Sequence, residues 1–353
     1  MKKSIYIYNP YFKTIGGGQQ IQNQLLSLFS NTFPESKVEL INNHKFFLLL
    51  FSNLHNKIFI LQSVFNINYI LFDFLNLLFK IDYYVIPRGD YIPLGTEDWK
   101  VSNLYLKIIL WKVFIKFRLR NANKVIFTSL LEKERYKNVG FSEHNSFIIP
   151  DFYDVENRFK NKTIPSKFIE NEYYLYVGRI SVEKNLEFLL KVFLILKSKF
   201  YDKKYNIPKL VLFAPYTNTK YHKSLILKIK KYDLERNIII FNSKNEIDLQ
   251  SAYNNTICVL LPSHIESFGL TVIESLYFDK PILISPNVPF NEKPNLNLYK
   301  INLVTDHWAD IIFNLYTNRK QTENFRNENT KDLYLSNFNS ESISAKWKAL
   351  FNI

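Results

Sequence analysis

The chain has 353 residues, more than one typical hydrophobic core uses, and this length predicts two domains of similar size. Its net charge of +14 indicates an anionic partner, such as a phosphorylated substrate, an anionic membrane surface or nucleic acid. The single cysteine, Cys258, excludes a disulfide framework and a thiolate metal site, and it fits a reducing cytoplasm.

The N-terminal residues MKKSIYIYNPYF carry two lysines, but the apolar run after them is too short for the core of a signal peptide. We therefore expect this segment to stay uncleaved and to form a strand. The most apolar stretch, residues 58–79, is interrupted by polar side chains that include Gln62, Asn68 and Asp73, which argues against a membrane-spanning helix. The sequence predicts a soluble or peripheral protein.

Short β-branched or aromatic runs alternate with helix-length segments along the first half of the chain. One such segment, residues 21–33, places Ile21, Leu25, Leu28 and Phe29 on one helical face. This alternation is typical of a parallel sheet covered by helices. The predicted strands are residues 4–8, 37–41, 58–61, 83–86, 124–128 and 147–149.

A second series of strands begins at Tyr173, after a polar, irregular stretch at residues 151–171 that we interpret as a linker. We predict an α/β protein with two doubly wound, Rossmann-like domains facing each other across a cleft, at residues 1–165 and 166–335. Ligands of such sheets bind at the carboxyl ends of the strands. The predicted strands of the second series are residues 173–177, 210–213, 237–241, 257–261, 281–285 and 301–304.

Three of the eight glycines stand together as Gly16, Gly17 and Gly18, after the first strand and directly before a helix. Backbone amides without side chains allow a large ligand to approach closely. The pattern is neither the GxGxxG fingerprint nor a Walker loop. A donor-binding loop and a plain turn both explain it.

The residues after the fourth strand, Pro87-Arg88-Gly89-Asp90, also reach the carboxyl edge of the first sheet. Arg88 can meet an anionic group of a donor or an acceptor, and Asp90 can act as a base toward an acceptor hydroxyl. A turn with a solvated Arg–Asp pair is the alternative.

The segment from Leu104 to Lys124 mixes basic and large apolar residues. It can lie on an anionic membrane with its apolar face partly inserted, or form a core helix with a solvated basic face. The basic residues are Lys107, Lys112, Lys116, Arg118, Arg120 and Lys124.

Gly178 opens the stretch GRISVEKN, directly after the strand that begins the second domain. Arg179 and Lys184 stand at the start of the next helix, where they can point into the cleft. Two fixed cations there can hold a diphosphate and offset its growing charge as a glycosidic bond breaks. Surface cations with no ligand are the alternative.

The stretch SHIESFGLTVIESLYFD, residues 263–279, follows a buried strand and contains the start of a helix. Its turn combines backbone N–H groups with the positive end of a helix, which suits a diphosphate. Glu266 and Glu274 flank the turn and can accept hydrogen bonds from hydroxyl groups on either side of the diphosphate. An ordinary turn with solvated glutamates is the alternative.

The FGL core and the seven residues between Glu266 and Glu274 resemble the E-x7-E motif of retaining glycosyltransferases of family 4, also called glycosyl transferases group 1, which have the GT-B fold. The element from Gly178 to Asn185 is similar to that family's G-R-x-x-x-x-K-N element, and the glycines at 16–18 resemble its glycine-rich loop. The resemblance implies that Glu266 contacts the donor sugar and that Glu274 binds the ribose. It assigns the diphosphate to Arg179, Lys184 and the amides of Ser267, Phe268, Gly269 and Leu270.

In GT-B enzymes a last helix crosses back to the first domain, and we expect residues 336–353 to do so. Ile343, Trp347 and Leu350 have compatible helical spacing, although a helix that caps its own domain has the same pattern. Because the sequence has no D-x-D triplet and no histidine cluster, we expect no metal.

The resemblance implies a hexosyltransferase that moves a sugar from a UDP- or GDP-sugar to a glycan or lipid-linked acceptor, with retention. By the family's habits this serves bacterial surface polysaccharide (capsule, or the O-antigen of lipopolysaccharide), in the cytoplasm or at the inner face of its membrane. One alternative is a sugar-nucleotide epimerase of related fold. The other is a non-catalytic nucleic-acid or polyanion-binding protein, although the basic residues are dispersed and no recognition module is visible.

Overall fold

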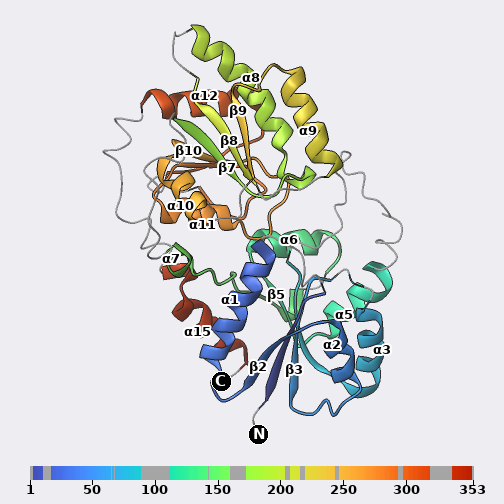
Figure 1. Ribbon diagram of the computed structural model, residues 1–353. Helices are drawn as coiled ribbons and strands as arrows, with labels where there is room; N and C mark the ends of the chain where they lie inside the picture. The colour runs from blue at the N-terminus through green and yellow to red at the C-terminus, as the bar shows by residue number, and fades with distance from the viewer. Residues whose placement is uncertain are drawn as a thin grey trace. The chain divides into compact units, whose positions relative to one another are not determined.

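The computed structural model describes residues 3–10, 17–64, 66, 68–88, 111–141, 143–159, 172–202, 207–214, 219–242, 246–292, 297–318 and 336–351. The chain divides into two compact units. Unit 1 consists of Met1–Tyr153 and Phe338–Ile353, and unit 2 of Asp154–Asn337. Each unit contains one parallel six-stranded sheet with helices packed against it (Figure 1). The predicted α/β architecture is therefore confirmed.

The sheet of unit 1 has the strand order β2-β1-β3-β4-β5-β6. Successive side chains of its strands enter two different apolar clusters, as the pleat requires. Tyr6 and Tyr8 pack into one cluster, and Ile5 and Ile7 into the other. The strands are β1 (Ser4–Tyr8), β2 (Lys37–Ile41), β3 (Lys57–Gln62), β4 (Asp82–Ile86), β5 (Lys124–Phe127) and β6 (Ser146–Ile148).

Two groups of helices cover the two faces of this sheet. One face packs against α2 (Asn43–Leu50), α3 (Tyr69–Phe79), α5 (Lys116–Asn121), which continues the π-helix η1 (Trp111–Ile115), and α6 (Leu130–Asn138). The other face packs against α1 (Gly17–Thr32) and α15 (Ser340–Phe351). A short 3-10 helix, η2 (Glu143–Asn145), precedes β6.

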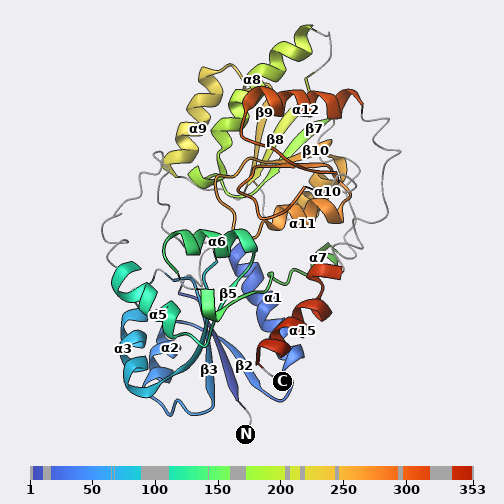
Figure 2. The same cartoon turned by 180° about the vertical axis from the view of Figure 1, so that it is seen from behind.

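The last helix, α15, returns to unit 1, as predicted. Its Trp347 is 2% exposed and meets Phe29 of α1 edge to face, with 4.7 Å between the ring centroids. Thr32 and Ser344 share a hydrogen bond of 2.7 Å at the same interface. Figures 1 and 2 both show α1 and α15 side by side.

The sheet of unit 2 has the strand order β12-β11-β10-β7-β8-β9. Tyr174 of β7 faces α8 and α12, because its ring meets Phe193 and its hydroxyl donates to the carbonyl of Ile312. The neighbouring Tyr173 faces α10 and donates to the carbonyl of Ala252. The strands are β7 (Tyr173–Val177), β8 (Lys209–Ala214), β9 (Ile238–Asn242), β10 (Cys258–Leu261), β11 (Ile282–Ile284) and β12 (Leu298–Lys300). The helices are α7 (Val155–Phe159), the 3-10 helix η3 (Val182–Lys184), α8 (Leu186–Asp202), α9 (Lys220–Lys231), α10 (Glu246–Asn255), α11 (Leu270–Tyr277) and α12 (Thr305–Thr317).

The predicted strand at residues 301–304 is wrong, since the edge strand β12 lies just before it at Leu298–Lys300. The apolar residues at 301–304 instead lead into helix α12. Val304 is the residue before that helix, and the Asn302 carbonyl accepts hydrogen bonds from the Val304 amide and the Trp308 indole. Residues 301–304 therefore lead into a helix and do not form the strand that the pattern predicted.

The predicted linker, residues 151–171, is irregular only in part. Residues 155–159 form helix α7, which belongs to unit 2 and buries Val155 and Phe159. Phe159 meets Phe278, which follows α11, with ring centroids 5.0 Å apart. Residues 160–171 lie outside the described part of the chain. Within the described part, no helix combines the length and apolar character needed to cross a membrane.

Candidate active site

The site begins at the carboxyl end of β7, where the chain turns at Gly178. The Gly178 φ of +151° is one that other residues rarely adopt, and a Cβ there would lie 2.7 Å from the Tyr176 hydroxyl. That hydroxyl donates a 2.7 Å hydrogen bond to the carbonyl of Arg179. Burial, with the nearby carboxylates of Glu266 and Glu183, raises the pKa of Tyr176 well above its ordinary value. The phenol therefore stays a donor and fixes the backbone that carries Arg179.

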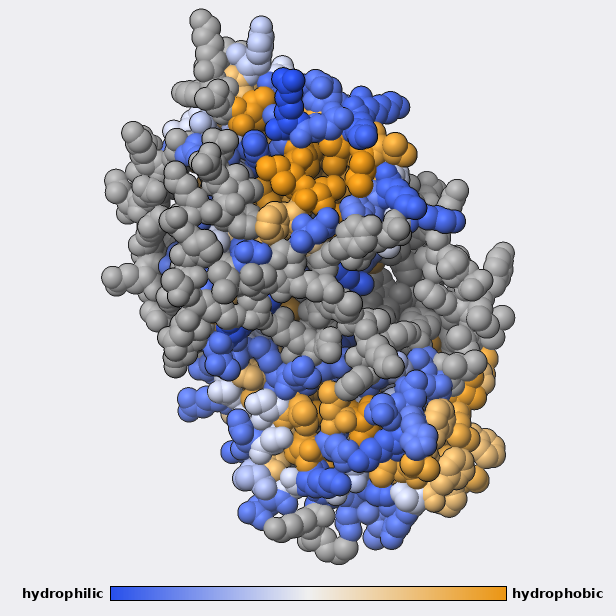
Figure 3. Space-filling view, viewed as in Figure 1, coloured by the Kyte–Doolittle hydropathy of each residue, from blue (hydrophilic) through white to orange (hydrophobic). Residues whose placement is uncertain are grey.

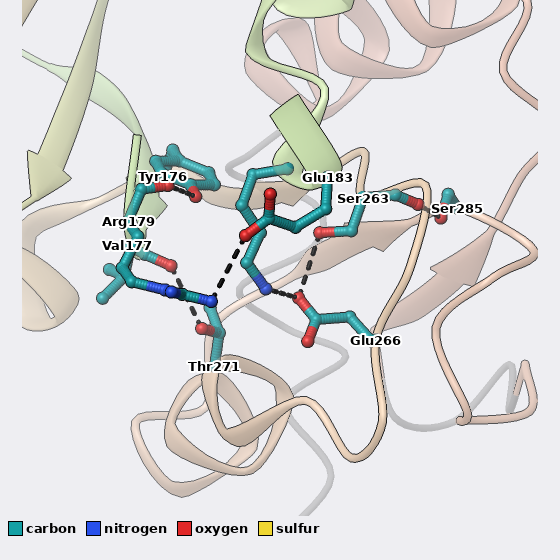
Figure 4. Close-up of polar contacts among 9 residues, drawn as sticks. Tyr176, Val177, Arg179, Glu183, Ser263, Glu266, Thr271 and Ser285 are labelled. Carbon is teal, nitrogen blue, oxygen red and sulfur yellow. Dashed lines mark hydrogen bonds and ion pairs between the residues drawn. The ribbon is translucent and has the colours of Figure 1, made fainter. Parts of the chain in front are cut away.

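The loop after β10 is bonded directly to this turn, because β10 and β7 are neighbouring parallel strands. The His264 amide donates to the Glu183 carbonyl at 2.8 Å, and the Asn185 side chain donates to the Pro262 carbonyl at 3.1 Å. The Thr271 hydroxyl donates to the carbonyl at the end of β7, that of Val177, at 3.2 Å. These three bonds hold the two loops in one fixed arrangement, and Figure 4 shows the bond from Thr271 to Val177.

At the centre of the arrangement, Lys184 forms an ion pair with Glu266. The two side chains are only 15% and 12% exposed. The Ser263 hydroxyl donates a 3.0 Å hydrogen bond to the same carboxylate oxygen, Oε1 (Figure 4). A carboxylate held by two donors has a fixed position, which suits a group that must accept a hydrogen bond from a substrate hydroxyl.

Arg179 is more open to solvent than Lys184. Its side chain is 59% exposed and its Nη2 lies 3.2 Å from the carboxylate of Glu183, four residues later. The exposed Arg179 side chain can therefore change its position, whereas the largely buried Lys184 side chain is held by Glu266. Such a pair can bind two phosphate groups of one ligand.

Helix α11 starts at the same edge of the sheet, directly after Gly269. Gly269 has a φ of +93° and a ψ of 62°, and no side chain caps the helix start. A Cβ at Gly269 would touch Val288, Phe290 and Val272 at ordinary distances, so the backbone conformation, and not the space, favours glycine. Ser267, Phe268 and Leu270 surround this helix start, which carries a positive dipole end suited to an anion.

Glu274 lies one turn deeper in α11 and is 3% exposed. It forms an ion pair with Arg158 of α7, and its Oε2 accepts a 2.6 Å hydrogen bond from the Tyr253 hydroxyl of α10. Glu274 therefore joins three helices of unit 2. A ribose that binds Glu274 has to share the carboxylate with these two partners.

In unit 1, Arg88 follows β4 with a φ of +54° and is 14% exposed. Its Nη1 donates a 2.7 Å hydrogen bond to Asp151, so Arg88 is not the solvated arginine of the alternative considered above. Burial raises the pKa of Asp151 more than Arg88 lowers it. The Nε and Nη2 of Arg88 are buried, and among the residues that the structure describes they have no hydrogen-bond partner. Asp90 lies outside the described residues.

The structure thus brings together most of the predicted donor-site residues in unit 2. Gly17 and Gly18 form the first turn of α1 in unit 1, and Gly16 lies outside the described residues. Sequence reasoning missed Glu183, Ser263, Arg158 and Tyr253. Only Glu183 had a signal, its spacing of four residues from Arg179.

No group of three or more His, Cys, Asp or Glu side chains with the arrangement of a metal site occurs in the described ranges. Cys258 is fully buried in β10, and burial raises the pKa of its thiol. This cysteine is therefore a core residue.

Comparison with known proteins shows which proteins this chain is similar to. Residues 157–332 match the family model described as glycosyl transferases group 1. The chain is 26% identical over 244 residues to the capsular polysaccharide biosynthesis glycosyltransferase CapH of Staphylococcus aureus, covering 67% of this chain and 62% of the relative. It is 26% identical over 162 residues to CapM of the same organism, covering 46% of this chain and 40% of the relative.

Among solved structures, the chain is similar to Anabaena HepE in complex with UDP and glucose, with a TM-score of 0.74 and 14% identity over 99% of both chains. This similarity shows the fold, which is GT-B. The chain spans 40% of the length of CapM and 62% of the length of CapH.

Proposed function

We propose that this chain, whose residues 157–332 match the glycosyl transferases group 1 model, moves a sugar from a nucleotide-diphosphate donor to a glycan or lipid-linked glycan. We propose further that the anomeric configuration is retained, that no metal is needed, and that the product enters a capsule or O-antigen. The observation that carries the proposal is the Lys184–Glu266 pair, held beside the start of α11 by the loops after β7 and β10.

In the proposed reaction, the bond between the anomeric carbon and the diphosphate oxygen breaks while a bond to the acceptor oxygen forms, and the proton of the acceptor hydroxyl passes to the leaving diphosphate. Negative charge grows on the leaving diphosphate. Arg179, Lys184 and the N–H groups at the start of α11 stabilise that charge, which is the task a divalent cation performs in other transferases. Glu266 accepts a hydrogen bond from a hydroxyl of the donor sugar and so orients the anomeric carbon.

The first experiment is calorimetric titration of the full chain with UDP and GDP, with EDTA and with Mg²⁺. The similarity to a protein solved with UDP and glucose makes UDP the first choice. We expect binding with equal affinity in both buffers. Affinity that appears only with Mg²⁺ contradicts the metal-independent proposal, and no binding of either nucleotide contradicts the donor site.

Lys184→Met tests the diphosphate contact, and Lys191→Met, an exposed lysine of α8, is its matched control. We expect the first variant to lose about 10- to 100-fold in UDP or GDP affinity, or about 1.5 to 3 kcal/mol, because a charge-assisted hydrogen bond is lost. The control should bind like the wild-type chain. Equal losses in both variants would remove Lys184 from the site.

Glu266→Gln tests the sugar contact. We expect transfer to fall by about 100-fold, or about 3 kcal/mol of transition-state stabilisation, while nucleotide affinity changes little. Turnover is measured as nucleotide release with and without added acceptor. Conversion of the donor without any acceptor indicates the epimerase alternative, and the anomeric proton coupling of the product decides retention.

A further inference from the structure

Unit 1 exposes six large apolar side chains on two neighbouring helices. We call these residues the α2–α3 patch: Leu48 (59% exposed), Phe51 (74%), Phe74 (59%), Leu77 (63%), Leu78 (62%) and Phe79 (60%). Figure 3 shows apolar surface gathered at the lower right edge, over α2 and α3. Scattered single apolar residues are normal on a protein surface, whereas a contiguous group marks an interaction site.

The apolar side chains of the α2–α3 patch are exposed although the core beneath the two helices is well packed. The inward faces of both helices are already filled, since Phe46 of α2 and Phe72 of α3 are fully buried and stack with ring centroids 5.9 Å apart. Helix α3, with the sequence YILFDFLNLLF, is apolar on its outer face as well. A helix that is apolar all round is expected where both of its faces leave water.

The sequence stretches that form and flank the α2–α3 patch are rich in basic residues and poor in carboxylates. In the stretches 42–57, 68–80 and 111–121 the sequence contains a single carboxylate, Asp73. It is buried and held by two hydrogen bonds from Arg118 of α5, at 2.9 and 2.6 Å, so it presents no charge to the surface. Exposed or half-exposed bases of the same stretches are Lys45, which pairs with Glu39, and Lys57, Lys80, Lys116 and Arg120.

We propose that the α2–α3 patch binds unit 1 to the surface of an anionic lipid bilayer. Phenylalanine and leucine side chains enter the boundary between headgroups and acyl chains, while the basic residues remain at the level of the anionic headgroups. A second copy of the chain is a poorer occupant, because it would bring two positively charged rims together.

This surface differs from the membrane contact predicted at Leu104–Lys124. In the described part of that segment, Ile115 and Leu119 are buried in the core and Arg118 is used by Asp73. The Arg118–Asp73 bonds place α5 beside α3, whereas the Lys116 ammonium lies next to Gly140, after α6. The apolar contact is supplied by α2 and α3.

The proposal does not depend on the transferase activity, because binding to lipid is measured without substrate. The probe is co-sedimentation of the full chain with vesicles of phosphatidylcholine alone or mixed with phosphatidylglycerol. We expect binding to the mixed vesicles that falls as salt is raised, and at least about tenfold weaker binding to phosphatidylcholine. Equal binding to the two vesicle types would overturn the anionic part of the proposal.

The variant Phe74→Ser/Leu78→Ser removes apolar area from exposed positions, so the fold should persist; unchanged nucleotide binding and circular dichroism serve as checks. The matched control is Leu227→Ser, a 67% exposed leucine of α9 in unit 2. We expect the double variant to lose at least about tenfold in vesicle binding and the control to lose nothing. Vesicle binding by the double variant that equals wild-type binding would overturn the proposal. Light scattering that shows a dimer for the wild-type chain and a monomer for the double variant would overturn it as well.

Discussion

Each cation assigned to the diphosphate has a carboxylate partner within the same two loops. Lys184 pairs with Glu266, and Arg179 with Glu183. A diphosphate that binds Arg179 competes with the Glu183 carboxylate, whereas it can bind Lys184 without displacing Glu266. The exposed Arg179–Glu183 pair is worth little and is easily exchanged, whereas the buried Lys184–Glu266 pair has a defined geometry that the substrate joins.

At the residue scale, Gly178→Ala is expected to disturb the site without touching any charged group. The new methyl would lie 2.7 Å from the Tyr176 hydroxyl, and the φ of +151° adds backbone strain. We expect nucleotide affinity to fall by about tenfold, because the segment that carries Arg179 and Lys184 shifts. Adding Tyr176→Phe removes the closest contact together with the hydrogen bond to the Arg179 carbonyl, so the double variant is compared in calorimetry with Tyr176→Phe alone. We expect Gly178→Ala to cost less affinity in the Tyr176→Phe background than in the wild-type chain, and an equal cost would mean that backbone strain alone sets the loss.

Arg158→Ala probes the buried pair beneath the site. The variant leaves the Glu274 carboxylate, 4% exposed in its side chain, without its guanidinium partner. Removing one partner of a buried ion pair costs about 3 kcal/mol or more in the free energy of unfolding. The exposed pair Lys199–Asp310 is the control, and Lys199→Ala should cost less than about 1 kcal/mol. Urea unfolding of both variants measures the change in the free energy of unfolding. An equal loss in the two variants would mean that the Arg158 side chain is exposed to water in solution.

At the scale of elements, the last helix holds α1 on the sheet of unit 1. Trp347 contacts Phe29 and Phe351, and Ile343 and Leu350 lie in the same apolar cluster. We expect Trp347→Ala to cost about 3 to 5 kcal/mol, because it leaves a cavity between two helices. Lys348→Ala, an exposed change on the same helix, is the control and should stay within about 0.5 kcal/mol. A small loss in urea unfolding for Trp347→Ala would show that α15 is dispensable.

The sequence predicts an element well when the residues of that element alone determine its structure. Buried parallel strands such as β1 and β7 are continuous apolar runs, and their predicted bounds agree with the structure. The strand at 301–304 failed because the Asn302 carbonyl and Trp308 form a helix start there, a contact that a periodicity cannot show. Helix α7 was missed because its burial depends on α11, far along the chain.

The same distinction applies to the site. Residues within one loop, such as those near Gly178 and Gly269, could be assigned from motifs and from their position after strands. Arg158 could not, since 116 residues separate it from Glu274 and only the packing of α7 against α11 brings them together. Motifs therefore propose candidate ligand-binding residues, whereas the residues that support them can be found only from the fold.

At the scale of the whole molecule, buried tyrosines in both units make the fold sensitive to alkali. Burial raises the pKa of Tyr84 in unit 1 to about 12, with help from Asp82, and raises the pKa of Tyr221 in unit 2 to about 12, with help from Glu187. The unfolded chain loses these phenolic protons near pH 10.0, whereas the folded chain keeps them up to about 12. The stabilisation is therefore complete below pH 10.0 and is lost as the pH rises toward 12.

We expect the free energy of unfolding to fall between about pH 10 and 12, with each of these tyrosines contributing at most about 1.4 kcal/mol per pH unit. Urea unfolding across this range measures the slope. Tyr84→Phe keeps the ring contact with Phe351, at 4.8 Å between centroids, and should make the slope shallower. Tyr201→Phe, at an 83% exposed position, is the control and should leave the slope as it is. A slope that is the same in all three proteins would assign the alkaline loss to other groups, such as the lysines in ion pairs.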